Sequence, residues 1–135
     1  MDIIKLLLVE DNTIVREGIA GLIEIQEDLE VIGEAAGGPE ALSLLQGGLR
    51  PDIVLTDLNM PVMDGIELTE RICALEISNI SVIMLTMHNK QIFVDKSFKA
   101  GAKGFLLKNG DFEELFMGIR QVYQNEFFVS AGIQN

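Results

Sequence analysis

The stretch Ile53-Val54-Leu55-Thr56-Asp57 is the most informative one for the fold, because a short apolar run of the kind that forms a buried strand is followed directly by a carboxylate. This run, at residues 52–56, is one of four continuous apolar runs, and the others are at residues 3–9, 80–85 and 104–107. Such runs are typical of parallel strands that are covered by helices on both faces. The sequence therefore predicts a parallel α/β sheet in which Asp57 follows a strand.

Amphipathic segments separate these runs. Val15, Ile19, Leu22 and Ile23 follow a helical spacing, and so do Leu68, Ile72 and Leu75. Gly38-Pro39 is typical of a helix start and Gly47-Gly48 of its end, while Asp111 with Glu114 predicts a capping box before the last helix. Residues 29–35 alternate apolar and polar side chains, which favours an edge strand.

Strict alternation of strand and helix predicts a single domain, residues 1–135, of (βα)5 architecture. Right-handed crossovers place helices on both faces of a parallel five-stranded sheet. We expect the strand order 2-1-3-4-5, in which the first and third strands are neighbours. The order reverses between these two strands, and ligands bind at such a reversal, beyond the carboxyl ends of the strands.

Composition excludes several classes of function. A formal net charge of −11 argues against nucleic-acid binding by this chain, because phosphate binding needs clustered Lys and Arg. The single cysteine, Cys73, excludes an internal disulfide, and we expect it to be a core residue. The run at residues 3–9 has no features of a secretion signal and is too short to cross a bilayer. We therefore expect a cytoplasmic protein without membrane contact.

Glu10, Asp11 and Asp57 end the first and third strands. Carboxylates that meet in one crevice repel one another, so a bound cation would stabilise them. Mg²⁺ prefers oxygen ligands and keeps several waters, which suits such a set, with Mn²⁺ as an alternative. The alternative interpretation is that these acids cap helices, although Asn12 or Thr13 could already serve as the N-cap after Asp11.

Thr86 and Lys108 stand at the ends of the fourth and fifth strands, at the same edge of the sheet. A Lys ammonium can pair with phosphate or carboxylate, and a Thr hydroxyl can donate to a phosphoryl oxygen. Taken alone, Lys108 would be a surface strand end and Thr86 an ordinary helix cap. Their combination with the three acids predicts a site for phosphoryl chemistry.

Four pieces of the sequence, in this order and spacing, resemble the response regulator receiver domain of two-component signalling. They are Leu7 to Asn12, Asp57 to Gly65, Met84-Leu85-Thr86 and Gly101 to Lys108. The resemblance covers almost the whole chain and implies a flavodoxin-like fold. The neighbourhoods Thr86-Met87-His88-Asn89 and Lys108 to Asp111 look like receivers that precede LuxR-type (NarL/FixJ) DNA-binding domains.

The resemblance also implies roles for individual residues. Asp57 would accept the phosphoryl group from a sensor histidine kinase, and Lys108 would pair with the phosphoryl oxygens. Glu10, Asp11 and Asp57 would hold Mg²⁺ together with the backbone carbonyl of Asn59. Thr86 and Phe105 would form the switch. Since alternate side chains of a strand share a face, we expect Phe105 and Lys108 to point to opposite faces, with Phe105 reporting to the partner surface while Lys108 faces the site. The alternative is that Phe105 is an edge-strand core residue that never moves.

The same resemblance sets expectations about partners. We expect phosphorylation to favour a homodimer, and DNA to be bound only through a C-terminal domain that this chain lacks. A free-standing receiver that acts through protein contacts is an alternative, as is a pseudo-receiver without phosphorylation. A further hypothesis is that His88 influences the lifetime of the phosphoryl group.

An enzymatic alternative uses similar residues. Phosphatases of the haloacid-dehalogenase type also combine a strand-end Asp with Mg²⁺ and Lys, but they need a second Asp two residues later. Asn59 occupies that position. We therefore expect a chain that catalyses only its own phosphorylation and dephosphorylation.

Overall fold

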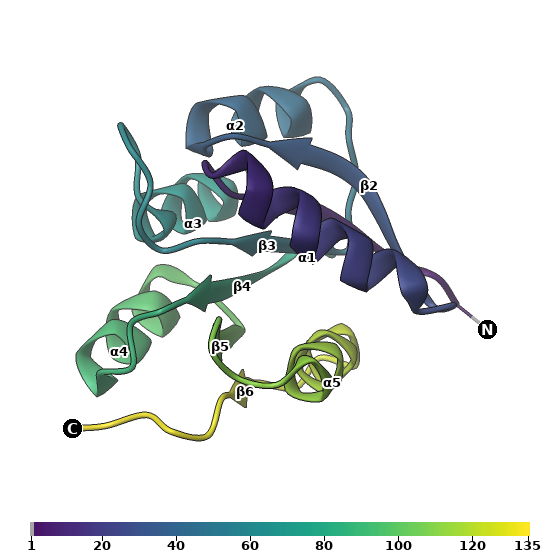
Figure 1. Cartoon of the computed structure of the whole chain (residues 1–135). Helices are drawn as coiled ribbons and strands as arrows, with labels where there is room; N and C mark the ends of the chain where they lie inside the picture. The colour runs from purple at the N-terminus through teal and green to yellow at the C-terminus, as the bar shows by residue number, and fades with distance from the viewer. Residues whose placement is uncertain (1) are drawn as a thin grey trace.

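The computed structural model describes residues 2–135, in which strands and helices alternate along the chain (Figure 1). The strands are β1 (Ile4–Val9), β2 (Leu29–Ala35), β3 (Ile53–Thr56), β4 (Ser81–Thr86), β5 (Gly104–Leu107) and β6 (Phe128–Val129). The helices are α1 (Thr13–Ile25), α2 (Gly38–Gln46), α3 (Gly65–Ala74), α4 (Gln91–Ala100) and α5 (Phe112–Tyr123). The five strands expected from the sequence are all present.

The sheet has the order β2-β1-β3-β4-β5-β6, and all its pairings are parallel. The predicted order 2-1-3-4-5 is thus confirmed, and β2 lies at an edge as its alternating pattern indicated. The sheet has six strands rather than five, however, because residues 128–129 pair with β5. β5 is therefore covered along part of its outer edge.

Helices cover both faces of the sheet. Helices α1 and α5 pack on one face, where side chains such as Ile23 and Ile119 meet Leu8 of β1 and Leu106 of β5. The opposite face carries α2 and α3, and also α4, whose Val94 packs against the β4 and β5 side chains. Because each central strand is buried on both sides, the polar side chains of the candidate site lie at the last residue of a strand or just beyond it.

Side-chain caps fix where three of the helices begin. Asn12 Oδ1 accepts a hydrogen bond from Val15 N at 3.1 Å, so Asn12 is the N-cap of α1 and Asp11 is left free of this task. Asp64 caps α3 and Asp111 caps α5, each through a 2.8 Å bond from the backbone amide three residues on. Caps of this kind typically contribute about 1 kcal/mol each.

Cys73 is an exposed residue of α3, so the expectation that it belongs to the core is wrong. The buried face of α3 carries Leu68 and Ile72, and position 73 is rotated about 100° from Ile72 around a helix of 3.6 residues per turn. Among the described residues, no helix combines the length and the apolar character needed to cross a membrane.

Candidate functional site

The ends of four neighbouring strands bring the candidate residues to one edge of the sheet. The backbone amide of Asp57 donates to the carbonyl of Val9 at 3.1 Å, which continues the β1–β3 ladder past the strand ends. This bond sets Glu10 beside Asp57. On the other side, the amide of Lys108 donates to the carbonyl of Thr86 at 2.8 Å and extends the β4–β5 ladder in the same way.

Glu10, Asp11 and Asp57 form a cluster in which one carboxylate oxygen from each residue lies within 4.8 Å of the others. The burial of the three acids differs, since Glu10 is buried, Asp57 is half-buried and Asp11 is exposed. Glu10 Oε2 accepts the amide of Asn12 at 3.0 Å, which fixes this side chain. The sequence-based expectation that the three acids meet at one point agrees with this geometry.

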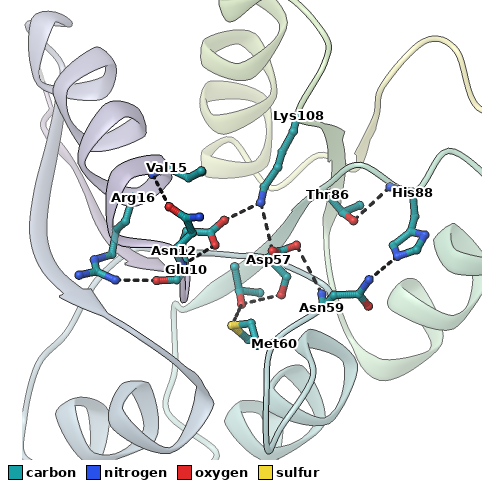
Figure 2. A network of polar contacts seen from close by, with 11 residues as sticks. Glu10, Asn12, Val15, Arg16, Asp57, Asn59, Met60, Thr86, His88 and Lys108 are labelled. Carbon is teal, nitrogen blue, oxygen red and sulfur yellow. Dashed lines mark hydrogen bonds and ion pairs between the residues drawn. The ribbon is translucent and has the colours of Figure 1, made fainter.

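Lys108 bridges two of the acids (Figure 2). Its Nζ atom lies 2.5 Å from Glu10 Oε1 and 3.1 Å from Asp57 Oδ2. Burial disfavours the charge on Lys108, but the hydrogen bonds and charges of Glu10 and Asp57 together outweigh it and raise the pKa of Lys108 above its usual value. The ammonium is therefore charged at neutral pH and neutralises part of the acidic cluster.

The donor set fits a hard divalent cation. All the side chains of the cluster offer carboxylate oxygens, and the exposed Asp11 leaves one side open to solvent. Mg²⁺ accepts such ligands and retains waters for its remaining positions. Asn59 is exposed next to this cluster, and its amide N lies 3.4 Å from Asp57 Oδ1, so its backbone belongs to the same neighbourhood.

Thr86 lies at the end of β4 with 1% of its surface exposed. Its Oγ1 atom accepts a hydrogen bond from the amide of His88 at 3.2 Å. Lys90, not Thr86, is the N-cap of α4. The hydroxyl therefore holds the first residues of the β4–α4 loop, residues 87–90, rather than capping a helix.

Sequence reasoning missed the pairing of Asn59 with His88. Their atoms Nδ2 and Nε2 lie 2.5 Å apart, which joins the loop after Asp57 to the β4–α4 loop (Figure 2). The His88 ring also packs on Phe93, with centroids 4.4 Å apart. The two loops are far apart in the sequence, and neither residue type alone indicates such a contact.

Phe105 is fully buried, in a cluster with Leu58, Met84 and Val94. Its neighbour Leu106 belongs to the cluster on the opposite face. Phe105 and Leu106 thus lie on opposite faces of β5. Lys108 directly follows this strand, and its ammonium lies at the acidic cluster rather than in the cluster of Phe105. Phe105 does not reach a surface in this state, so its part in a switch stays a prediction.

Comparisons with known proteins identify the family to which this chain is similar. A family model described as the response regulator receiver domain matches residues 6–120. The transcriptional regulatory protein LiaR of Bacillus subtilis (strain 168) is 42% identical over 123 residues, which cover 91% of this chain and 57% of LiaR. The uncharacterized transcriptional regulatory protein YhcZ of the same organism is 38% identical over 129 residues, which cover 96% of this chain and 59% of YhcZ. The chain thus spans less than two thirds of the length of these curated relatives.

Solved structures show the same similarity. The crystal structure of a LuxR-family two-component response regulator from Aurantimonas sp. SI85-9A1 matches with a TM-score of 0.92 and 36% identity, covering 98% of this chain and 93% of that one. The isolated REC domain of RcsB from Salmonella enterica serovar Typhimurium, studied with phosphomimetic BeF3⁻, has a TM-score of 0.86 and 25% identity, covering 98% of this chain and 96% of that one. The chain therefore belongs to the family of response regulator receiver domains.

Proposed function

We propose that Asp57 is the phosphoacceptor of this receiver domain and that a sensor histidine kinase supplies the phosphoryl group. The observation that carries the proposal is the position of the Asp57 carboxylate. It lies within the cluster of Glu10 and Asp11 and is paired with Lys108. A strand-end carboxylate is a weak nucleophile, so the transfer depends on positioning and on neutralisation of charge.

In the proposed step, an Asp57 oxygen forms a bond to phosphorus while the bond between phosphorus and the donor imidazole breaks. The imidazole leaves with the electron pair of that bond. Lys108 is 19% exposed in its side chain and already points at Asp57, so it is placed to pair with a phosphoryl oxygen. Bound Mg²⁺ would supply further neutralisation of the phosphoryl charge, held by Glu10, Asp11 and Asp57 and by the Asn59 carbonyl.

Thr86 and Phe105 are the proposed switch. A phosphoryl group on Asp57 would draw the Thr86 hydroxyl toward it, and the packing around Phe105 would then change. We infer that this change favours homodimer formation and that, in a longer protein, it regulates transcription through an output domain. Related proteins support the last step, since LiaR carries the name of a transcriptional regulatory protein and RcsB dimers have been solved bound to DNA. We also propose that the protein acts in the cytoplasm.

The assignment of Asp57 can be tested by mass. Incubation with Mg²⁺ and acetyl phosphate should add one phosphoryl group to the wild-type chain and none to Asp57→Asn. Asp64→Asn is the matched control, because Asp64 lies in the same stretch but caps α3, and Asn is an equally good N-cap. An adduct that persists in Asp57→Asn would disprove the assignment.

The switch can be tested in the same samples. Thr86→Ala should accept the phosphoryl group at Asp57, because Thr86 is not a partner of that carboxylate in the hydrogen-bond network. It should lose most of the phosphorylation-dependent gain in dimer, measured by sedimentation. Wild-type dimer formation by phosphorylated Thr86→Ala would show that Thr86 does not carry the signal.

A further inference from the structure

The C-terminal strap, residues 126–135, runs beside β5 toward the end of the sheet that holds the site (yellow in Figure 1). After α5 the chain turns at Asn125, whose φ is 67°, and enters β6. Phe128 N donates to the Lys103 carbonyl at 3.1 Å, and Ser130 N donates to the Phe105 carbonyl at 2.9 Å. The strap therefore follows the strand that leads to Lys108.

Ser130 anchors the middle of the strap. Ser130 is 4% exposed, and its Oγ donates a hydrogen bond to Glu114 Oε1 at 2.6 Å. Ser130 Oγ also accepts a hydrogen bond from the backbone amide of Leu107 at 3.0 Å. Ala131 N donates to the second Glu114 oxygen at 3.2 Å. These bonds connect the strap to α5 and β5, and none of them involves the loops around the site.

The far end of the strap depends on a different partner. Gln134 N donates to the Asn89 carbonyl at 2.7 Å, and the Gln134 carbonyl accepts the amide of Gln91 at 2.7 Å. Gln134 itself is exposed, and Ile133 packs at the margin of the cluster that contains Phe105. The last residues are thus held largely by the β4–α4 loop and the start of α4.

This loop is the one that Thr86 holds. Thr86 Oγ1 accepts the amide of His88, which is next to Asn89 in the sequence. If a phosphoryl group on Asp57 draws the Thr86 side chain toward it, the bond to His88 N lengthens and the loop loses a fixed point. The carbonyl of Asn89 and the amide of Gln91 then shift away from Gln134, while the Ser130 anchor is unaffected.

We propose that the far end of the strap, residues 132–135, is docked on the β4–α4 loop in the unmodified state and is released when Asp57 is modified. The inference rests on the proposed function of Asp57 and Thr86. It adds a second element whose position depends on the state of Asp57, coupled to the site through backbone hydrogen bonds of Asn89, Gln91 and Gln134. Since coupling is reciprocal, undocking the strap should in turn favour the modified state.

Amide hydrogen exchange tests the release directly. The probe is beryllium fluoride with Mg²⁺, and ¹⁹F resonances that disappear in Asp57→Asn report the adduct at Asp57. On adduct formation, the amides of Gln91 and Gln134 should exchange about tenfold faster, whereas those of Phe128 and Ser130 should stay protected. Thr86→Ala lacks the acceptor for His88 N, so its Gln91 and Gln134 amides should exchange fast already without the adduct, and adduct formation should cause no further change.

A matched pair of variants tests the reciprocal effect. Gln134→Pro removes the backbone donor to Asn89 and should bind beryllium fluoride about fivefold more tightly, at the lower end of typical allosteric coupling. Gln134→Ala keeps both backbone bonds and should bind like the wild type.

The outcomes separate the two proposals. The proposed release of the strap would be overturned by an adduct at Asp57 that leaves the exchange rates of the Gln91 and Gln134 amides unchanged. Equal affinities of Gln134→Pro and Gln134→Ala for beryllium fluoride would overturn it as well. Neither result would affect the assignment of Asp57 as the phosphoacceptor. If no adduct forms at Asp57, both proposals fail.

Discussion

His88 Nε2 lies 2.5 Å from Asn59 Nδ2, and this contact joins the two loops that flank Asp57. The His88 ring is further fixed by its packing on Phe93. The backbone amide of Asn59 lies 3.4 Å from an oxygen of the Asp57 carboxylate, which we propose as the phosphoacceptor. We expect the paired imidazole and amide to limit how water approaches a phosphoryl group there.

The first prediction concerns the lifetime of that group. His88→Ala removes the partner of Asn59 and opens the approach for water, so hydrolysis of phosphorylated Asp57 should be about fivefold faster, which corresponds to one hydrogen bond of about 1 kcal/mol. The decay can be followed by intact mass after removal of acetyl phosphate. Met87→Ala, at an exposed neighbour in the same loop, is the control and should decay like the wild type. Equal lifetimes of His88→Ala and wild type would contradict the prediction.

The second prediction concerns Lys108. Its removal in Lys108→Ala leaves the buried Glu10 carboxylate and Asp57 without their shared cation. Unpaired buried charge is costly, and partial exposure of this site reduces the effect, so the free energy of unfolding without metal should fall by about 2 kcal/mol. Millimolar Mg²⁺ should restore part of the loss. Chemical denaturation measures both, with the exposed Lys99→Ala as a control that should stay near wild type.

The third prediction concerns the metal. Lys108 already neutralises charge on Glu10 and Asp57, so Asp11 is the acid left without this cation. Asp11→Asn should therefore raise the metal-free stability only slightly, by less than about 1 kcal/mol. Mg²⁺ should stabilise the wild type by about 2.7 kcal/mol at a hundred times its Kd, and this gain should be largely absent in Asp11→Asn. Wild-type melting curves that do not respond to Mg²⁺ would argue against the site.

The site was largely predictable because strand ends are visible in the sequence. Continuous apolar runs locate the ends of β1, β3, β4 and β5, and parallel topology then brings Glu10, Asp57, Thr86 and Lys108 to one edge. No further information is needed for this step, since each residue directly follows or ends its run.

Contacts that depend on loop and strap geometry were not predictable. β6 has only two residues, Phe128 and Val129, which is too short for any periodicity. Asp111 caps α5 as expected, but the Glu114 carboxylate binds Ser130 and Ala131, so only half of the expected capping box forms. The tertiary partner of Glu114 could not be read from its spacing to Asp111.

The fourth prediction is a pH dependence that arises far from the site. Arg120 of α5 binds both oxygens of Asp28 at 2.8 Å, and these hydrogen bonds lower the pKa of the Asp28 carboxyl below its usual value. The unfolded chain therefore binds more protons than the folded one in acid, so this contribution is present above about pH 4 and is lost as the pH falls through the lowered pKa.

Asp28→Asn should accordingly cost about 1 kcal/mol of unfolding free energy at pH 7, because Arg120 is substantially exposed and solvent screens the pair. The difference from the wild type should shrink steadily below about pH 4. Denaturation series at several pH values measure it, and Glu17→Gln, at an exposed position of α1, serves as the control. A difference that is constant with pH would show that the Asp28 charge is not responsible.

The last prediction concerns Gly65, which closes the stretch that begins at Asp57. A Cβ atom at this position would lie 2.4 Å from the Asp57 carbonyl oxygen and 3.0 Å from Leu58 Cα. Both neighbours are backbone atoms, one of Asp57 itself and one of the residue that follows it, so they cannot move aside without shifting Asp57. Gly65→Ala should therefore lower the free energy of unfolding by about 1–3 kcal/mol, which is typical of overpacking, and it should also slow phosphorylation by acetyl phosphate.

Gly18→Ala should change the free energy of unfolding in the opposite direction in the same experiment. Gly18 lies within α1, and a Cβ there meets nothing within 4 Å. Replacing Gly by Ala in an open helical position should raise stability by up to about 1 kcal/mol and leave phosphorylation unchanged. If Gly65→Ala were as stable and as readily phosphorylated as Gly18→Ala, the close approach of α3 to the Asp57 backbone would not constrain the site.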